Sequence, residues 1–295
     1  MFIVIIIHLL YFFANKIIIK FIVDKFYSGI TTLHRLNLDA PLVLVMWRNL
    51  TSNRVPDALH FVELFILGSS TWLAYTADRF FEKIEYCPNK SSRFSIGRQN
   101  PHRFILLWVV CLVVTVWVSS EMISYPIWIV GWCIACLVFL NFIFNLFEYP
   151  KRINFLAKRV RTSAILATGC IFWDIGNLSI IRILILWLSF YFIFELNCFL
   201  IEDQEQKQCK LQEMNIFPHA EYCSKLLEIR FLFTGLLTWA LWLVDFKILA
   251  FSIGSTVLIA LFLRLSTKDV NAFRINLDTM YWLLPMFNWI CFHGV

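Results

Sequence analysis

The chain has 295 residues, of which 60% are hydrophobic and 16% carry charge. Soluble domains contain about 45–50% apolar and about 25% charged residues, so this composition excludes a water-soluble core of this size. The formal net charge of +6 is modest. Because the apolar residues come in long blocks, the sequence predicts an all-α, polytopic membrane protein, a bundle of about nine transmembrane helices.

The first residues differ from the rest of the chain. "MFIVIIIHLLYFFANK" is apolar for only about 13 residues before Lys16, which is too short to cross a bilayer comfortably. It also lacks the basic start and the small-residue cleavage site of a signal peptide. We expect residues 1–29 to form an interfacial segment in which Lys16, Lys20 and Lys25 face lipid headgroups. Residues 30–295 are expected to form a single transmembrane domain.

Nine apolar segments follow, each near the roughly 20 residues that a membrane helix needs. The first and the fifth are weak, since Asp39 and Pro41 interrupt one and Asp174 ends the other. In chain order the segments are 37–53, 57–78, 104–121, 124–146, 162–177, 179–201, 230–246, 248–264 and 276–293.

Lysine and arginine are distributed unevenly between the two sides of these segments. Seventeen of them follow the second, fourth, sixth and eighth segments, and four more precede the first. The opposite side holds only Arg48, Arg54, Arg182 and Lys247. By the positive-inside rule, we expect an integral multi-pass protein of a bacterial inner membrane, with the N-terminus and the long loops in the cytoplasm.

Two of the segments end in the same pattern, an apolar helix followed by acidic residues. The second segment ends in "AYTADRFFE", residues 74–82, and the sixth ends in "NCFLIEDQE", residues 197–205. Asp78 and Glu82 are four residues apart and share one helix face, as two ligands of one metal ion must. Tyr75 lies one turn earlier on the same face. A long basic loop follows each stretch.

This layout resembles the UbiA superfamily of intramembrane prenyltransferases, whose nine-helix members carry Asp-rich motifs at the cytoplasmic ends of helices 2 and 6. The family pattern is close to N-D-x-x-D-x-x-x-D. At the first site the chain keeps the last two acids as Asp78 and Glu82, whereas Ala74 and Tyr75 stand in place of the leading Asn and Asp.

The second site matches the family pattern less well. It keeps Asn197 and the final acid, Glu205, whereas Cys198 and Ile201 stand where the other two acids would be. Other stretches resemble a bacterial UbiA-like subgroup, namely "LNLDAPLVLVMW", "KRVRTSAILATGCIFW" and "FRINLDTMYWLLPMF".

The resemblance implies transfer of a prenyl group from an isoprenyl diphosphate to a hydrophobic acceptor, which is an aromatic compound, a quinone precursor or a lipid. The diphosphate leaving group carries about three negative charges, so the site needs Mg²⁺ held by carboxylates, with lysine or arginine nearby. The implied catalytic residues are Asp78, Glu82, Asn197 and Glu205, and the implied metal ligands are Asp78, Glu82 and Glu205. The expected substrate-binding residues are Tyr75, Arg103, Lys158, Arg159 and Arg161.

The same residues allow other interpretations. Asp78 and Glu82 lie where a helix meets water, and a solvated helix end needs no special function. The aligned positions offer fewer acids than the family's sites usually do, which leaves open a catalytically degenerate protein that binds a lipid or isoprenoid without turnover. A transporter or channel subunit is a further alternative, for which Glu195 inside the sixth segment is the marker.

Motifs of other protein classes are absent from the sequence. It contains no HExxH, no P-loop and no GxSxG, and no run combines basic and aromatic residues as a nucleic-acid site would. Cys133 and Cys136 form a CxxC without a partner pair, which favours two small helix-packing residues over a redox or zinc site. We therefore expect the lipid bilayer and the substrates as partners, and no nucleic acid. The oligomeric state is not predicted.

Overall fold

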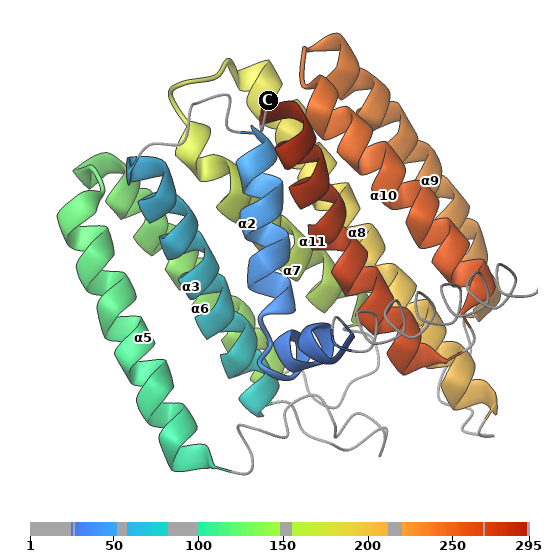
Figure 1. The fold of residues 1–295 in the computed structure, drawn as a ribbon, viewed down its shortest axis with the longest axis horizontal. Coiled ribbons are helices and arrows are strands. Elements are labelled where there is room, and N and C mark those ends of the chain that lie inside the picture. The colour runs from blue at the N-terminus through green and yellow to red at the C-terminus, as the bar shows by residue number, and fades with distance from the viewer. Residues whose placement is uncertain are drawn as a thin grey trace, which may run out of the picture.

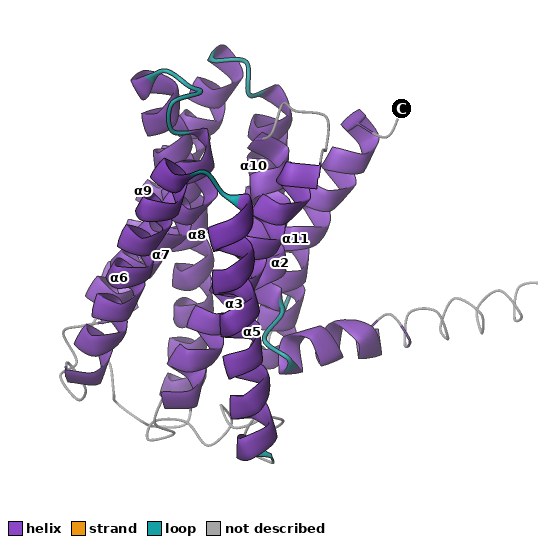
Figure 2. Cartoon of the chain, turned by 90° about the vertical axis from the view of Figure 1, so that its left-hand side faces the viewer, coloured by secondary structure: helices purple, strands orange, loops and turns teal. Residues whose placement is uncertain are grey.

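A computed structural model describes residues 25, 27–51, 58–81, 100–147, 155–211, 220–267 and 269–293. All regular secondary structure within those ranges is helical (Figures 1 and 2). In chain order the elements are α2 (Asp39–Thr51), α3 (Ala58–Phe81), α5 (Pro101–Met122), α6 (Tyr125–Phe147), α7 (Phe155–Ile171), the 3₁₀ turn η3 (Phe172–Asp174), α8 (Ile180–Leu211), α9 (Ala220–Leu243), α10 (Lys247–Ser266) and α11 (Val270–His293).

Each predicted segment overlaps one of these α-helices, so the prediction of an all-α bundle is confirmed. Four helices, α5, α6, α8 and α10, are long and apolar enough to cross a membrane, whereas the count of nine spans stays a prediction. Several helices extend past the predicted segments. The helix α8 continues to Leu211, and α9 begins at Ala220. Hydropathy detects only the apolar part of a helix, while the backbone hydrogen bonds continue into polar sequence.

Consecutive helices run in opposite directions along the bundle (Figure 1). One end of the bundle therefore collects the ends of α3, α6, α8 and α10, after which the predicted basic loops follow. We refer to this end as the basic end, and to the opposite end, where α2 and α11 finish, as the far end. The membrane side on which the basic end lies stays a prediction.

A short helix before α2 lies across the bundle. Residues 27–35 are helical, and both views show this crosswise helix turned away from the bundle axis at the basic end (Figures 1 and 2). An orientation across the bundle is what a helix at a membrane surface requires. Most of the predicted interfacial segment 1–29, including Lys16 and Lys20, lies outside the described residues.

A tight turn joins the crosswise helix to α2. Leu38 N–H donates to the Leu33 carbonyl at 2.9 Å, and Asn37 N–H donates to the His34 carbonyl at 3.1 Å, which is the pattern of a Schellman motif. Asn37 has φ = 56°, a left-handed conformation that asparagine adopts more readily than most residues. The turn brings His34 close to Asp39, the first residue of α2.

The core lies between α2, α7, α8, α10 and α11. Trp47, Phe190, Phe273 and Tyr281 are fully buried there. The rings of Trp47 and Phe190 meet edge to face, with their centroids 6.3 Å apart. Lipid gives no hydrophobic force between helices, so close packing of this kind is what holds the central helices together.

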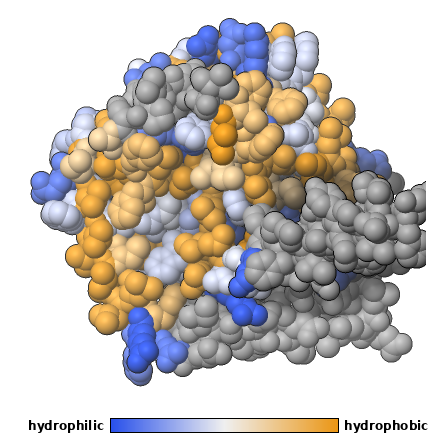
Figure 3. Space-filling view, in the orientation of Figure 1, coloured by the Kyte–Doolittle hydropathy of each residue, from blue (hydrophilic) through white to orange (hydrophobic). Residues whose placement is uncertain are grey.

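The exterior of the bundle is apolar. Few residues of α5 and α6 are buried, and Leu106, Val113 and Trp117 on α5 are 66%, 61% and 64% exposed. Figure 3 shows apolar residues across the middle of the visible face and hydrophilic residues mainly toward its upper and lower edges. An apolar surface of this extent suits contact with lipid rather than with water. This exterior is that of a membrane-embedded helical bundle.

Tyr281 joins α11 to α8 through one buried hydrogen bond, in which its hydroxyl donates to the Ile193 carbonyl at 3.3 Å. Tyr281→Phe removes that bond and keeps the ring, so we expect the free energy of unfolding to fall by about 0.5–1.5 kcal/mol. Titration with SDS in mixed micelles measures the change. Tyr125→Phe is the matched control, because Tyr125 is 71% exposed. Equal effects of the two substitutions would contradict a role for the Tyr281 hydroxyl in helix packing.

Candidate functional site at the basic end

Asp78 and Lys158 form an ion pair at the basic end. Asp78 lies near the end of α3, and Lys158 lies in the first turn of α7. Lys158 Nζ is 3.0 Å from Asp78 Oδ2 and 3.3 Å from Oδ1. The lysine side chain is 35% exposed and the aspartate side chain 29%. Two of the predicted site residues therefore meet, on helices that are not consecutive, where solvent reaches both.

A second set of contacts connects Tyr75 on α3 with Asn197 on α8. The Tyr75 hydroxyl lies 3.0 Å from Arg79 Nη2 and 3.5 Å from Arg274 Nη2. Arg274 Nε lies 3.7 Å from Asp278 Oδ2, one turn along α11. Asn197 Nδ2 donates to Asp278 Oδ1 at 3.4 Å. The two predicted motifs thus share one network, which passes through α11.

His34 and Asp39 extend this network to α2 and the crosswise helix. His34 Nδ1 is 3.0 Å from Asp39 Oδ2 and 4.0 Å from Asp278 Oδ2. Asp39 is 6% exposed and Asp278 is 8% exposed. We refer to the whole set as the polar cluster, which consists of His34, Asp39, Tyr75, Asn197, Arg274 and Asp278.

The sequence interpretation assigned no role to the carboxylates of Asp39 and Asp278. They lie on α2 and α11, outside the two expected motifs, and they bring acids to a site that lacks them at positions 75, 198 and 201. One signal was present in the sequence. The tripeptide Asn-Leu-Asp occurs at 37–39 and again at 276–278, each time beside an apolar stretch. An acid within a membrane helix is costly and therefore points to function.

The helices of the two predicted motifs are not principal neighbours. The helix α3 packs mainly against α2 and α5, whereas α8 packs against α7, α9 and α11. Direct facing of the two motifs, which a shared metal site would need, is therefore replaced by contact through α11. Glu82 lies outside the described residues. Glu205 lies on α8, and its side chain is also outside the described part of the chain.

Three arginines that were predicted to bind phosphate have different surroundings. Arg159 Nε lies 2.8 Å from Glu195 Oε1 on α8. Arg161 Nε donates to Asn141 Oδ1 on α6 at 2.9 Å. Arg103 is exposed in the first turn of α5. The printed sequence placed all three at the correct end of the bundle, but their described contacts are with helices other than α3.

Glu195 is buried between two arginines. Arg230 Nε on α9 lies 2.5 Å from its Oε2, opposite the contact of Arg159 with Oε1. Both guanidinium groups also lie over the Phe199 ring, at 4.8 Å for Arg159 and 4.4 Å for Arg230. Glu195 is only 2% exposed. The triad of Arg159, Glu195 and Arg230 connects α7, α8 and α9 and provides the counter-charge that a buried carboxylate requires.

Charged residues also meet at the far end. Arg48 Nη1 lies 2.6 Å from Asp174 Oδ2, and Arg48 Nη2 lies 3.5 Å from Glu63 Oε2. Nearby, His60 Nε2 and Asn49 Oδ1 are 2.7 Å apart. These contacts join α2, α3 and η3, the 3₁₀ turn that contains Asp174. The fifth apolar segment therefore ends at Asp174 because this acid is paired inside the bundle.

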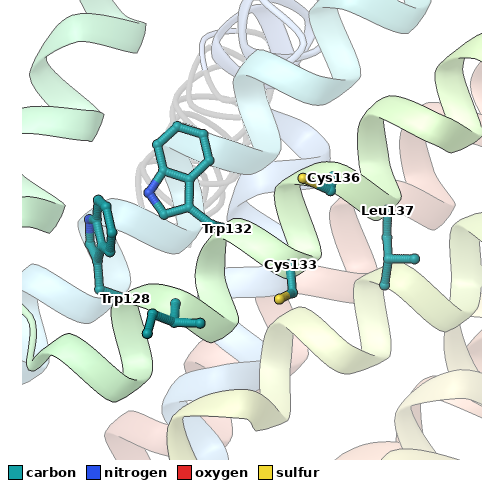
Figure 4. Close-up of a pocket in the computed structure, with 6 residues that line it drawn as sticks. Trp128, Trp132, Cys133, Cys136 and Leu137 are labelled. Atoms are coloured by element: carbon teal, nitrogen blue, oxygen red, sulfur yellow. The ribbon is translucent and has the colours of Figure 1, made fainter.

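An apolar groove of about 580 Å³ follows α6 (Figure 4). Cys133 and Cys136, the CxxC of the sequence, lie along it as free thiols and are exposed rather than packed between helices of this chain. The residues that line the groove are Trp128, Ile129, Trp132, Cys133, Cys136 and Leu137. This lining is almost entirely apolar and offers nothing that recognises a polar substrate.

The basic end is the part of the described chain that combines anion-binding and cation-binding groups. Lys158 and Arg274 can attract phosphate, while Asp39, Asp78 and Asp278 can attract a metal ion. Of the three implied Mg²⁺ ligands, only Asp78 has a described side chain, and its carboxylate contacts Lys158. No family model matches the chain, and comparisons with curated proteins and with solved structures found no match.

Proposed function

We propose that the protein is a membrane-embedded prenyltransferase of UbiA-like arrangement, which transfers a prenyl group from an isoprenyl diphosphate to a hydrophobic acceptor. The observation that carries the proposal is the ion pair of Asp78 and Lys158, one turn along α3 from the polar cluster, in a bundle with an apolar exterior. A substrate with a charged head and an apolar tail needs this division. The proposal includes nine spans, with the basic end on the cytoplasmic side of a bacterial inner membrane.

In the proposed reaction the bond between C1 of the prenyl chain and the diphosphate oxygen breaks, and the diphosphate leaves with the bonding electrons. Lys158 and Arg274 contribute positive charge for the leaving group. Asp78, with Glu82 and Glu205, is proposed to hold Mg²⁺, which supplies further counter-charge when bound. The acceptor then attacks the allylic cation and releases a proton. The apolar interior of the bundle keeps water away from that cation.

Asp78→Asn is expected to lower the rate of prenyl transfer by about 10²-fold or more, because it removes the charge and keeps the shape. The ion pair with Lys158 is about one-third exposed, so its loss should lower the free energy of unfolding by only about 0–1 kcal/mol. The assay uses purified protein, radiolabelled geranyl or farnesyl diphosphate, Mg²⁺ and a panel of aromatic and quinone-precursor acceptors. Asp245→Asn is the control, since Asp245 lies at the far end and its side chain is 80% exposed.

Exchange of the two charges separates chemistry from structure. The double variant Asp78→Lys with Lys158→Asp keeps an ion pair between α3 and α7, so stability is expected to return while transfer stays low. Equal binding and turnover by wild type and Asp78→Asn would refute the proposal at this site. Binding of labelled diphosphate without product would instead identify a protein that binds an isoprenoid without turnover. A transporter or channel has less support, because both oxygens of its marker Glu195 contact arginines.

A further inference from the structure

Three potential ligand atoms meet inside the polar cluster, and each comes from a different element. His34 lies on the crosswise helix, Asp39 in the first turn of α2, and Asp278 on α11. One ligand atom from each lies within 4.8 Å of the other two. Atoms bonded to one metal ion at about 2.1 Å are about 3.0–4.2 Å apart in tetrahedral or octahedral geometry. The distances of 3.0 and 4.0 Å from His34 Nδ1 to the two carboxylates fall within that range.

The polar atoms around this point are short of hydrogen bonds. His34 Nδ1 makes none, despite its 3.0 Å approach to Asp39 Oδ2. Asp39 Oδ1 is buried without a hydrogen-bond partner, and Asp39 is only 6% exposed. Asn197 Oδ1, on the amide that approaches Asp278, is also buried without a partner. Buried polar atoms are nearly always bonded, and unbonded acceptors grouped in this way are suited to share a cation.

We propose that His34, Asp39 and Asp278 bind a divalent transition-metal ion of the Mn²⁺, Fe²⁺ or Zn²⁺ class. One imidazole nitrogen with two carboxylate oxygens is a ligand set that these ions accept, whereas Mg²⁺ prefers oxygen ligands alone. The site is separate from the Mg²⁺ proposed at Asp78, and its occupancy is measured without substrate. Failure of one proposal is therefore distinguishable from failure of the other.

The backbone holds the three ligands in place. The Schellman turn at Asn37 fixes His34 relative to Asp39, and the packing of α2 against α11 fixes Asp39 relative to Asp278. Asn197 contacts the second oxygen of Asp278, as the outer partners of metal-bound carboxylates do. The metal ion thereby attaches the crosswise helix to the bundle. The competing explanation is a protonated His34 that pairs with both acids and binds no metal.

Metal retention by the full-length protein in nanodiscs tests the proposal. The protein is stripped with EDTA, incubated separately with Mn²⁺, Zn²⁺ or Mg²⁺, passed through a desalting column and analysed by mass spectrometry for metal. We expect about one equivalent of Mn²⁺ or Zn²⁺ per chain, and at least about tenfold less Mg²⁺. His34→Ala and Asp278→Asn should each weaken retention by about 10²-fold or more. His102→Ala and Asp245→Asn, at exposed positions, are the matched controls and should retain the metal.

A spectroscopic measurement on the wild type avoids any dependence on variant folding. In the Mn²⁺-loaded protein, pulsed electron paramagnetic resonance is expected to detect the ¹⁴N coupling of one bound imidazole. Mn²⁺ binding without this coupling would overturn the assignment of His34. So would retention that is equal in wild type, His34→Ala and Asp278→Asn. Absence of retained metal in the wild type would establish the ion pair of protonated His34 instead.

Discussion

Arg48→Met is expected to lower the free energy of unfolding by about 3–5 kcal/mol. The Arg48 side chain is 4% exposed, and its guanidinium lies between Asp174 and Glu63, whose side chains are 14% and 9% exposed. Its removal leaves two carboxylates in a region of low dielectric without their shared cation. Because the three residues lie on α2, α3 and η3, the loss loosens the contact between three elements at once.

The measurement is SDS titration of the protein in mixed micelles, followed by circular dichroism. Arg182→Met is the matched control, since Arg182 is an exposed arginine near the far-end start of α8, and it should change stability by less than about 0.5 kcal/mol. Adding Asp174→Asn and Glu63→Gln to Arg48→Met removes all three charges and should restore most of the loss. A destabilisation that these two additional substitutions leave unchanged would show that Arg48 acts through packing alone.

Glu195→Gln is expected to cost a comparable free energy of unfolding, about 3–5 kcal/mol. The carboxylate contacts Arg159 and Arg230 through its two oxygens, and a glutamine offers one acceptor and no charge. Two buried guanidinium groups would then lie over the Phe199 ring with no anion between them. The repulsion acts between α7 and α9, so the packing of both against α8 should weaken.

The same titration measures this second effect. Glu228→Gln is the matched control, because Glu228 lies on α9 two residues from Arg230 and is exposed. Adding Arg230→Met to Glu195→Gln removes one of the two cations and should recover part of the stability. Proton or ion flux through reconstituted wild type that Glu195→Gln abolishes, with no loss of stability, would contradict a structural role and favour the transporter alternative.

The outcome at individual residues separates what local sequence predicts from what it cannot. Asp78, Tyr75 and Lys158 were assigned to one end of the bundle from hydropathy and charge, and the contacts of Asp78 with Lys158 agree with that assignment. Asp39 and Asp278 were not assigned, although both stand in the repeated Asn-Leu-Asp. Their proximity depends on the packing of α2 against α11, the first and last helices of the bundle, which no local pattern contains.

The sequence by itself determined the helices and their alternating directions. Long apolar segments must satisfy every backbone group internally, and only a helix does so within one segment of chain. Only the tertiary structure decided which polar residues meet. Lipid does not distinguish one apolar helix face from another, so helix neighbours are selected by detailed packing and by buried pairs such as those of Glu195 and Arg48. Those contacts join residues far apart in the chain, which is why the polar cluster emerged from the fold and not from the motifs.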